Sequence, residues 1–248
     1  MKLNLSIIIC TKNSAQTINS CLNSSLALLK SGAELLLVDG RSNDKTIKYV
    51  LEFVKKNNIL YYKILTQLNN GLYTAFNLGI ENTSRNKILF LHSDDTLKNT
   101  HSLILDAKKS DADVIFYGVE IEGTLFRRKW HLENLISINI NSMFLPPHTG
   151  ILVSRDVYSK IGKFNTNYEI AGDFDWMLRL FSSSNISFTF SSEITYVMRS
   201  GGVSNSGVTS EIKKFVEDVR VLKSLGFKFA IYKVFRKKIS KLHQLRKI

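Results

Sequence analysis

Short apolar runs, each ending in polar residues, are the feature of this chain that most limits its fold. Two of them, LSIIIC at 5–10 and ELLLVD at 34–39, flank a stretch in which apolar residues recur every three or four positions. A continuous apolar run is typical of a strand buried on both faces of a parallel sheet, and the recurrence is typical of an amphipathic helix. The segments predict a βαβ unit whose helix opens near Asn13 or Ser14 as N-cap.

The same alternation continues to Asp95. Helical spacing of apolar residues occurs at 47–54 and 72–80, and further short apolar runs occur at 60–65 and 88–92. Because crossovers between parallel strands are right-handed, these units predict an α/β fold with an open, mostly parallel sheet and helices on both faces.

After Asp95 the pattern predicts antiparallel structure, including a hairpin around Gly123. The remaining predicted elements are helices at 97–107, 155–162 and from 172, and strands at 114–121, 124–130, 151–154, 186–190 and 194–198. No linker rich in Gly, Ser or Pro separates them. We therefore expect one catalytic body with halves at about 1–98 and 99–206, followed by a helical basic segment at 207–248.

The composition fits a soluble globular protein, with 44% hydrophobic and 22% charged residues. The sequence has no stretch of about 18 apolar residues to span a membrane, and its first apolar run is too short for a signal peptide. Cys10 and Cys21 lack metal-site spacing and are too few for a disulfide framework, so we expect both to be buried and reduced. These features predict a cytoplasmic protein.

Positive charge is concentrated in the segment 227–248. This segment has eight basic and no acidic residues, which leaves +5 of the net charge of +13 for the rest of the chain. As one helix it would place Lys237 and other basic residues opposite a broad apolar side. That apolar side comprises Phe227, Ala230, Ile231, Val234, Phe235, Leu242 and Leu245. The segment could bind an anionic partner, such as phospholipid headgroups or nucleic acid, or pack on the body with a solvated basic face.

Polar residues follow the first, second and fourth predicted strands. They are Thr11, Asn13, Asp39, Asp94 and Asp95. Ligands of an open parallel sheet bind at the carboxyl ends of its strands, so these side chains are expected to converge. Asp39 could accept a hydrogen bond from a uracil or ribose group, or it could cap the next helix, unless Ser42 or Asn43 does so.

Asp94 and Asp95 are the stronger indication of chemistry. Adjacent carboxylates repel each other unless a cation or a donor neutralises them. Mg²⁺ and Mn²⁺ suit oxygen ligands and are commonly held by one or two carboxylates together with substrate phosphates. The pair therefore predicts a metal-diphosphate site; the alternative is an Asp N-cap for the helix at 97–107 beside a solvated neighbour.

The segment GDFDW at 172–176 opens a helix with two acids. Asp173 and Asp175 lie about 200° apart around that helix, so only one is expected to face a cleft. Such an acid could be a general base for a sugar hydroxyl, or it could stabilise the positive end of the helix dipole. His148 could bind acceptor or donor or be structural, and Arg199 with the glycine turn after it could bind a diphosphate or form a plain turn.

Five segments together resemble a known family. They are SIIICTKNSAQTINSCLNSSL, LLLVDGRSNDKT, NNGLYTAFNLGI, ILFLHSDD and HTGILVSRDVYSKIGKFNTNYEIAGDFDWMLRL. In this order and at these separations they resemble the bacterial family 2 glycosyltransferases with the GT-A (Rossmann-like) fold, over about residues 4–206. The resemblance implies transfer of a hexosyl group, with inversion, from a nucleoside diphosphate sugar (a UDP-sugar first of all) to an acceptor hydroxyl.

The resemblance also implies roles for single residues. In that family the first segment and the aspartate of VDG cradle the nucleotide, which implies such contacts for Thr11, Asn13 and Asp39. The acidic motif touches ribose and holds the divalent cation. It therefore implies Asp94 as a nucleotide ligand and Asp95 as the ligand of Mn²⁺ or Mg²⁺.

The late acidic motif of the family supplies the base, which implies Asp173. Three positions depart from the family pattern. His92 stands where the acidic motif often begins with Asp. Gly172 replaces the Glu before the base, which leaves Asp175 as the alternative base. Thr74 stands where related sequences tend to have Asp, so donor contacts there are expected to differ.

A direct displacement needs a base and a cation but no protein nucleophile, and the chain shows no Ser-His-Asp or Cys-His pattern. One alternative is a nucleotidyltransferase, although TKNS at 11–14 is not the Gly-rich basic segment of such enzymes. Another is a non-enzymatic nucleic-acid or membrane-surface binding protein. The aromatic residues of 227–248 favour an amphipathic helix over a stacking platform, so no nucleic acid is expected. We expect a glycan or lipid-linked acceptor, in polysaccharide synthesis, and docking on the anionic inner face of the cytoplasmic membrane.

Overall fold

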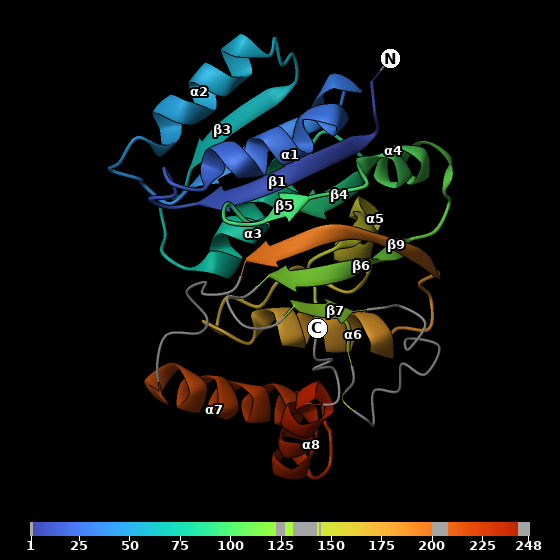
Figure 1. The fold of residues 1–248 in the computed structure, drawn as a ribbon. Helices are drawn as coiled ribbons and strands as arrows, with labels where there is room; N and C mark the ends of the chain where they lie inside the picture. Colours follow the sequence, from blue (N-terminus) through green and yellow to red (C-terminus); the bar gives the residue numbers. More distant parts are fainter. Residues whose placement is uncertain (1, 123–126, 131–142, 144, 200–207, 243–248) are drawn as a thin grey trace.

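The computed structural model describes residues 2–122, 127–130, 143, 145–199 and 208–242 (Figure 1). Its strands are β1 (Leu5–Thr11), β2 (Glu34–Asp39), β3 (Tyr62–Thr66), β4 (Lys87–Phe90), β5 (Thr96–Leu97), β6 (Val114–Glu122), β7 (Arg127–Trp130), β8 (Ile151–Ser154) and β9 (Phe188–Arg199). Its helices are α1 (Ile18–Lys30), α2 (Thr46–Lys56), α3 (Leu72–Asn82), α4 (Thr100–Lys109), α5 (Arg155–Lys160), α6 (Gly172–Ser182), α7 (Val208–Ser224) and α8 (Ala230–Leu242).

The strands of the described residues form one sheet in the order β3-β2-β1-β4-β8-β6-β9-β5, with β7 paired to β6. β1 is parallel to β2 and β4, β2 to β3, and β6 to β9. β8 runs antiparallel to both β4 and β6, so β6 and β9 share the direction of β1. Six strands therefore run one way, which confirms the predicted α/β fold with a mostly parallel sheet.

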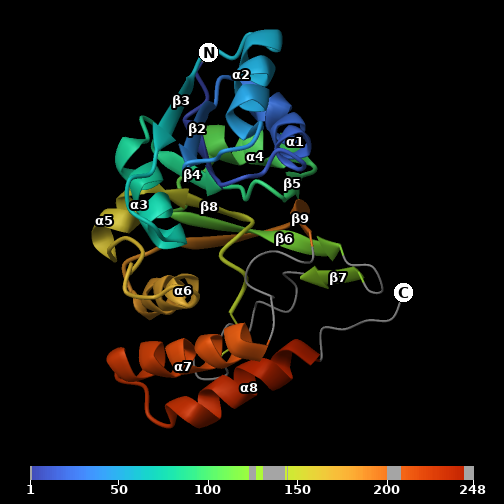
Figure 2. The same ribbon diagram turned by 90° about the vertical axis from the view of Figure 1, so that its left-hand side faces the viewer.

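The parallel strands supply two apolar cores because helices cover both faces of the sheet (Figure 2). Ile8 and Val38 belong to the core that contains α3 and α6. Ile7 and Leu37 belong to the core that contains α1, α2 and α4. Successive residues of a strand point to opposite faces, so a strand covered on both sides needs an apolar residue at every position. The continuous apolar runs of β1 and β2 follow from this double coverage.

The first helix begins later than predicted. α1 starts at Ile18 with Thr17 as its N-cap residue. Ser14 instead forms a turn, in which its carbonyl oxygen accepts from the N–H groups of Thr17 and Ile18. The buried face of α1 consists of Ile18, Cys21, Leu22, Ser25, Leu28 and Leu29, as the spacing predicts. Cys21 is a buried free thiol and Cys10 is a half-buried one.

Three predicted elements in the second half are wrong in detail. Residues 96–97 form the short strand β5, and α4 begins only at Thr100. The strands predicted at 186–190 and 194–198 are one strand, β9, whose pairing with β6 shifts register on either side of Gly118. The predicted hairpin is present as the antiparallel pair of β6 and β7, while its turn lies outside the described residues.

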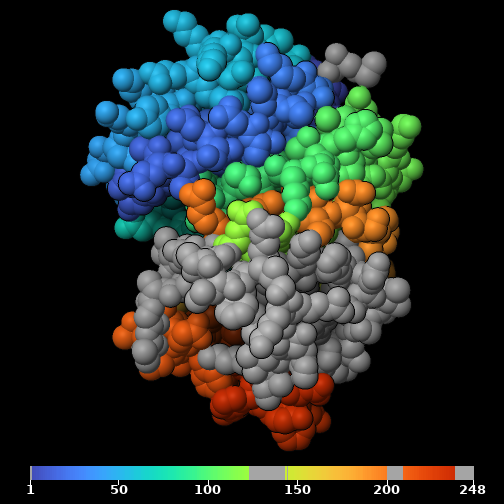
Figure 3. Space-filling view, in the orientation of Figure 1, coloured from blue at the N-terminus to red at the C-terminus, as the bar shows by residue number. Residues whose placement is uncertain are grey.

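Of the two C-terminal helices, α7 lies against α6 and α8 packs on α7, at the opposite end of the molecule from the N-terminal half (Figure 2 and Figure 3). They are separated by a turn in which Phe229 has a positive φ of 56°. The single helix predicted from residue 227 is therefore wrong at its start, because α8 begins at Ala230. Within the described ranges, the structure has no helix of the length and apolar character needed to cross a membrane.

The buried side of α8 differs from the predicted one. Ala230 and Val234 are buried, as an apolar side requires. Lys237, predicted on the solvated basic side, is half-buried instead, with a side chain only 14% exposed, and its Nζ forms an ion pair with Asp218 of α7 at 2.8 Å. Ile231, predicted with the apolar residues, is 55% exposed. The prediction fails here because α8 packs on its narrow Ala-Val-Lys edge and leaves larger apolar residues in solvent.

Candidate active site

The loops that follow β1, β2 and β4 are joined by side-chain hydrogen bonds. The N–H of Asn13 donates to Ser42 Oγ at 2.8 Å, and the N–H of Asn43 donates to Asn13 Oδ1 at 2.9 Å. The hydroxyls of Ser14 and Ser93 are 2.8 Å apart. The polar strand ends therefore converge at the carboxyl edge of the sheet, as predicted.

Asp39 is buried at the end of β2, opposite Thr11 of β1. Its carboxylate accepts from the hydroxyl of Ser42 at 2.6 Å and from the N–H of Ser42 at 3.1 Å. Asp44, rather than Asp39, accepts from the N–H of Thr46 at the start of α2, so the capping role considered for Asp39 is wrong. The buried Thr11 Oγ1 has no partner among the described residues, which leaves this hydroxyl able to bind a ligand.

Asp95 is buried and is anchored to β9. Its Oδ2 accepts from the hydroxyl of Tyr196 at 3.0 Å, and its Oδ1 accepts from the N–H of Arg199 at 2.8 Å. Burial, assisted by the charge of Asp94, raises the pKa of Asp95 to about 6. The helix-capping alternative for this pair is wrong, because the N-cap residue of α4 is Asn99.

The chemistry of this site fits a divalent cation only if a ligand contributes. Each carboxylate oxygen of Asp95 keeps a second lone pair, and Asp94 is half-buried beside it. Across the described ranges, no group of three or more His, Cys, Asp or Glu side chains is arranged to hold a metal. Mg²⁺ and Mn²⁺ are commonly held by one or two carboxylates plus substrate phosphates, so the pair fits a cation that arrives with a diphosphate.

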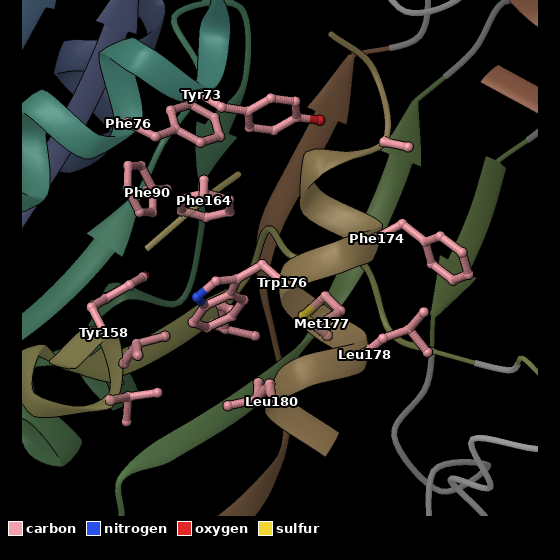
Figure 4. Packing of buried hydrophobic residues seen from close by; sticks show 14 of the residues in the cluster. Tyr73, Phe76, Phe90, Tyr158, Phe164, Phe174, Trp176, Met177, Leu178 and Leu180 are labelled. Atoms are coloured by element: carbon pink, nitrogen blue, oxygen red, sulfur yellow. The ribbon is translucent and has the colours of Figure 1, made fainter. Parts of the chain in front are cut away.

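The helix α6 is fixed in the core by aromatic stacking (Figure 4). The ring of Trp176 lies 5.1 Å from that of Tyr158 and 5.4 Å from that of Phe164, measured between centroids. Phe164 in turn stacks on Tyr73 of α3 at 5.8 Å. Such packing holds the first turn of α6, which carries Asp173, at a defined place beside α3.

Asp173 lies at the N-terminal turn of α6 and is half-buried. Its Oδ2 is 3.3 Å from Nδ1 of His148, and its Oδ1 is 3.3 Å from the hydroxyl of Tyr73. Oδ1 also accepts from the N–H of Phe174 at 2.7 Å. The structure therefore brings together two residues that the sequence singled out separately, Asp173 and His148.

The charge state of Asp173 follows from its neighbours. Removal of water by itself raises the pKa of this carboxyl, but the hydrogen bond and positive charge of His148 lower it, and so do the charges of Lys214 and Lys237. The net effect is a pKa below the usual range of an aspartate. Asp173 is accordingly a carboxylate at neutral pH and can accept a proton.

Asp175 points elsewhere. Its side chain is buried, and its Oδ2 is 2.9 Å from Nε and 2.8 Å from Nη2 of Arg179. The same guanidinium donates to the carbonyl oxygens of Gly162 at 3.1 Å and Lys163 at 2.8 Å. Asp175 therefore holds Arg179 and the loop after α5, and the structure leaves Asp173 as the acid of this motif that faces His148.

His92 follows β4, and its ring packs against His148, the residue paired with Asp173. Burial, assisted by the charge of His148, lowers the pKa of His92 to about 3. The centroids of the His92 and His148 rings are 5.5 Å apart, and the ring of Phe76 lies against both. A neutral imidazole thus stands where the family resemblance leads one to expect an acid. The buried Nε2 of His148 has no partner within the described part of the chain.

Gly172 is required by the ring of Tyr73. A Cβ at position 172 would lie 2.6 Å from the Tyr73 ring, closer than two carbon atoms can approach. The Tyr73 hydroxyl also donates to the carbonyl oxygen of Ile170 at 2.7 Å. The place that a longer residue would need before Asp173 is therefore filled by an aromatic side chain from α3.

Two predicted residues have no contact that defines a role. The hydroxyl of Thr74 donates only a long hydrogen bond, of 3.4 Å, to the carbonyl oxygen of Asn70. Arg199 has an exposed side chain, and its N–H is the group that binds Asp95. The glycine turn predicted at 200–204 lies outside the described residues, so diphosphate binding by Arg199 stays a prediction.

Three residues of the site have no local sequence signal. Tyr73 is indistinguishable from a core aromatic at helical spacing. Tyr196 supports Asp95 from 101 positions away. Glu217 of α7 accepts from backbone N–H groups just before α6. Each depends on a contact between segments far apart in the chain.

Comparison of the sequence with known proteins gives consistent results. The family described as glycosyl transferase family 2 matches residues 6–182. A PGL/p-HBAD biosynthesis glycosyltransferase of Mycobacterium bovis is 28% identical over 241 residues, which cover 93% of this chain and 90% of that protein.

Solved structures of two other proteins share the fold. S. aureus TarS 1-349 in complex with UDP superposes with a TM-score of 0.69 at 16% identity, over 96% of this chain and 70% of that one. The mannosyltransferase PcManGT from Pyrobaculum calidifontis, in complex with GDP-Man and Mn2+, superposes with a TM-score of 0.65 at 14% identity, over 98% and 70%. At these identities the likeness concerns the fold.

Proposed function

This chain belongs to glycosyl transferase family 2 and has the GT-A fold, and on that premise we propose that it transfers a hexosyl group from a nucleoside diphosphate sugar to an acceptor hydroxyl with inversion at the anomeric carbon. The observation that carries the proposal is the ionised carboxylate of Asp173 on a rigid helix end, beside His148. Membership in this family decides against a nucleotidyltransferase and against a non-enzymatic binding protein.

The reaction is a single displacement. Asp173 accepts the proton of the acceptor hydroxyl while the acceptor oxygen bonds to the anomeric carbon. The bond between that carbon and the diphosphate oxygen breaks on the opposite side, so the configuration inverts and the electron pair leaves with the nucleoside diphosphate. His148 and Tyr73, each 3.3 Å from a carboxylate oxygen, orient Asp173 for this step.

The donor nucleotide is proposed to lie on the convergent strand ends. Among the described residues Thr11 offers an unpartnered buried hydroxyl; Asn13 stands on the loop after β1, Asp39 at the end of β2, and Asp94 on the loop after β4. UDP is the nucleotide that we propose first, because TarS has the same fold and is known in complex with UDP and UDP-GlcNAc.

A divalent cation, Mn²⁺ or Mg²⁺, is proposed at Asp95, assisted by Asp94. When bound, such an ion offsets the negative charge that develops on the leaving diphosphate. The raised pKa of Asp95 supports this assignment, because a carboxylate that is poorly neutralised by the protein gains most from a cation. PcManGT, of the same fold, is known with Mn2+.

The first experiment is a screen of nucleotide sugars. We expect one donor to raise the thermal midpoint in the presence of Mn²⁺ and to release its nucleoside diphosphate when an acceptor is supplied. Asp173→Asn is expected to keep the donor-dependent stabilisation and to lose turnover. A chain that neither binds nor hydrolyses any nucleotide sugar contradicts the proposal.

We also propose that the enzyme docks on an anionic phospholipid surface through α7 and α8, which would bring its site to a lipid-linked acceptor. Large apolar side chains of these helices and of the turn between them are 50% to 79% exposed. They are Ile212, Val216, Phe229, Ile231, Tyr232 and Phe235, and we call them the hairpin surface. The rings of Phe215 and Phe235 meet at 5.5 Å, so the apolar stripes of the two helices adjoin.

The charge around the hairpin surface favours an anionic membrane over other apolar partners. Exposed basic residues on and between the same helices are Lys213, Arg220, Lys223, Lys228 and Arg236. Apolar side chains flanked by Lys and Arg suit the boundary between headgroups and acyl chains, where each basic residue near the surface adds about 1 kcal/mol. A cytoplasmic location on the inner face of the membrane is the compartment that this proposal requires.

Substitution tests the docking better than truncation, because residues 227–248 include Val234 and Lys237, which pack inside the protein. In vesicle co-sedimentation, Ile212→Asp with Ile231→Asp is expected to abolish binding to anionic vesicles. Leu51→Asp with Leu60→Asp, at exposed apolar sites at the far end of the molecule, is the matched control and is expected to bind like wild type. Equal binding by both double variants, or binding insensitive to salt, contradicts the docking.

A further inference from the structure

Glu217 of α7 is a buried acid that binds backbone rather than a basic side chain in the contacts described. Its Oε1 accepts from the N–H of Glu169 at 3.1 Å. Its Oε2 accepts from the N–H groups of Ile170 at 2.8 Å and Ala171 at 2.9 Å. Three successive N–H groups, all preceding the first residue of α6, thus share one carboxylate. Their position before the helix means that no carbonyl of α6 binds them.

Helix α3 holds the same backbone segment, just before α6, from the side opposite Glu217. The carbonyl oxygen of Ile170 accepts from the Tyr73 hydroxyl at 2.7 Å, and the ring of Tyr73 covers Gly172. Residues 170–172 are therefore clamped between α3 and α7. Asp173 is the next residue, so a movement of the clamped backbone moves its carboxylate.

The residues on either side of this segment also contact the two C-terminal helices. The hydroxyl of Tyr168 is 3.3 Å from Ser224 Oγ of α7. On the other side of Asp173, the Nζ of Lys237 lies 3.3 Å from the ring centroid of Phe174. The helices expected as an appendage to the catalytic domain therefore contact residues on both sides of the proposed base.

We infer that Glu217 is a positioning residue for the reaction: its carboxylate sets the backbone of residues 169–171 and thereby the place of the Asp173 carboxylate. This inference rests on the proposed role of Asp173. A glutamate suits the task because both of its oxygens only accept, whereas a glutamine would turn an amide group toward N–H donors and lose at least one bond. A displacement of a reacting group by about 1 Å can cost about 10²-fold in rate.

A role in stability alone would give a different result. If Glu217 only stabilised the fold, Glu217→Gln would lower the thermal midpoint, and its folded fraction would turn over like wild type. If Glu217 positions Asp173, the folded variant has a lower kcat at an unchanged KM for the donor, because donor contacts lie on β1, β2 and β4. The amides of residues 169–171 also exchange their hydrogens faster in the second case.

The experiment compares Glu217→Gln with Glu217→Asp and with Glu52→Gln, an exposed acid paired with Lys48 on α2. We expect kcat to fall by up to about 10²-fold in Glu217→Gln, to recover in part in Glu217→Asp, which keeps the charge, and to stay at the wild-type value in Glu52→Gln. Turnover is measured below the lowest thermal midpoint of the set. Should Glu217→Gln not fold, the kcat and the amide exchange of Glu217→Asp decide the question.

A wild-type kcat in the folded Glu217 variants overturns the inference and leaves the proposed function intact. A fall in kcat without faster exchange at residues 169–171 overturns it as well, because the clamp would then not be the cause. A wild-type protein without glycosyl transfer would instead overturn the proposed function, and the role of Glu217 with it.

Discussion

Substitution of the two acids of α6 separates the proposed base from a structural acid. Asp173→Asn and Asp175→Asn make the same chemical change two residues apart on one helix. The side chain of Asp173 is 37% exposed and lies beside His148, whereas that of Asp175 is 5% exposed and is paired with Arg179. The two variants are therefore matched controls for each other.

The magnitudes follow from these surroundings. Loss of a general base costs about 10² to 10⁴ in turnover. The lowered pKa of Asp173 means that its charge also stabilises the folded state at neutral pH, but the side chain is 37% exposed and an asparagine keeps an oxygen for the N–H of Phe174, so we expect a smaller loss of stability than at 175. At 175 the substitution leaves the Arg179 guanidinium without its carboxylate, but that group keeps the carbonyl oxygens of Gly162 and Lys163. The cost is then nearer the about 2 to 3 kcal/mol of a charged hydrogen bond than the larger cost of an isolated buried charge.

The assay combines nucleotide release with thermal unfolding. For a chain of this size, about 2 to 3 kcal/mol corresponds to a fall in Tm of roughly 5 to 10 °C. We expect Asp175→Asn to show that fall with near wild-type turnover, and Asp173→Asn to show a smaller fall in Tm, retained donor binding and lost turnover. An inactive Asp175→Asn with normal stability, beside an active Asp173→Asn, would refute the assignment.

Two further predictions concern Asp95. Asp95→Ala should abolish metal-dependent transfer, and near wild-type turnover across Mg²⁺ and Mn²⁺ titrations contradicts the metal assignment. The raised pKa of Asp95 means that its carboxyl group binds a proton more tightly in the folded protein than in the unfolded chain. The protonated carboxyl therefore adds to the free energy of unfolding below about pH 4, and this contribution is lost as the pH rises to about 6. The loss amounts to about 3 kcal/mol, and the free energy of unfolding of Asp95→Asn should not show this decrease with pH. If the free energies of unfolding of wild type and Asp95→Asn change with pH in parallel, the argument is contradicted.

Local periodicity and motif order account for what could be predicted of this protein. The runs at β1 and β2 identify buried strands because a sheet covered on both faces needs apolar residues at consecutive positions. The alternation of strands and helices then places Thr11, Asp39 and Asp95 at one sheet edge, since parallel strands end on the same side. These inferences need only neighbours in the sequence.

Boundaries and appended helices were predicted less well, because competing contacts decide them. Asn13 was a reasonable cap for α1, but its side chain binds the loop after β2 instead. A helical wheel orders the residues of α8 around its axis but does not say which side packs. Tertiary packing turned Lys237 inward, where Asp218 pairs with it, and left Ile231 in solvent.

The sequence by itself determined which residues are candidates for the chemistry, and the tertiary structure decided what each of them does. The motif at 172–176 offers two acids on different sides of a helix, and nothing local says which side meets His148 and which meets Arg179. Tyr73 fills the space over Gly172, and Glu217 holds the backbone before α6, through contacts that span about a hundred and about fifty positions of the chain. Such contacts are fixed only when the packed core brings distant segments within hydrogen-bond distance, which is why no pattern of neighbouring residues reveals them.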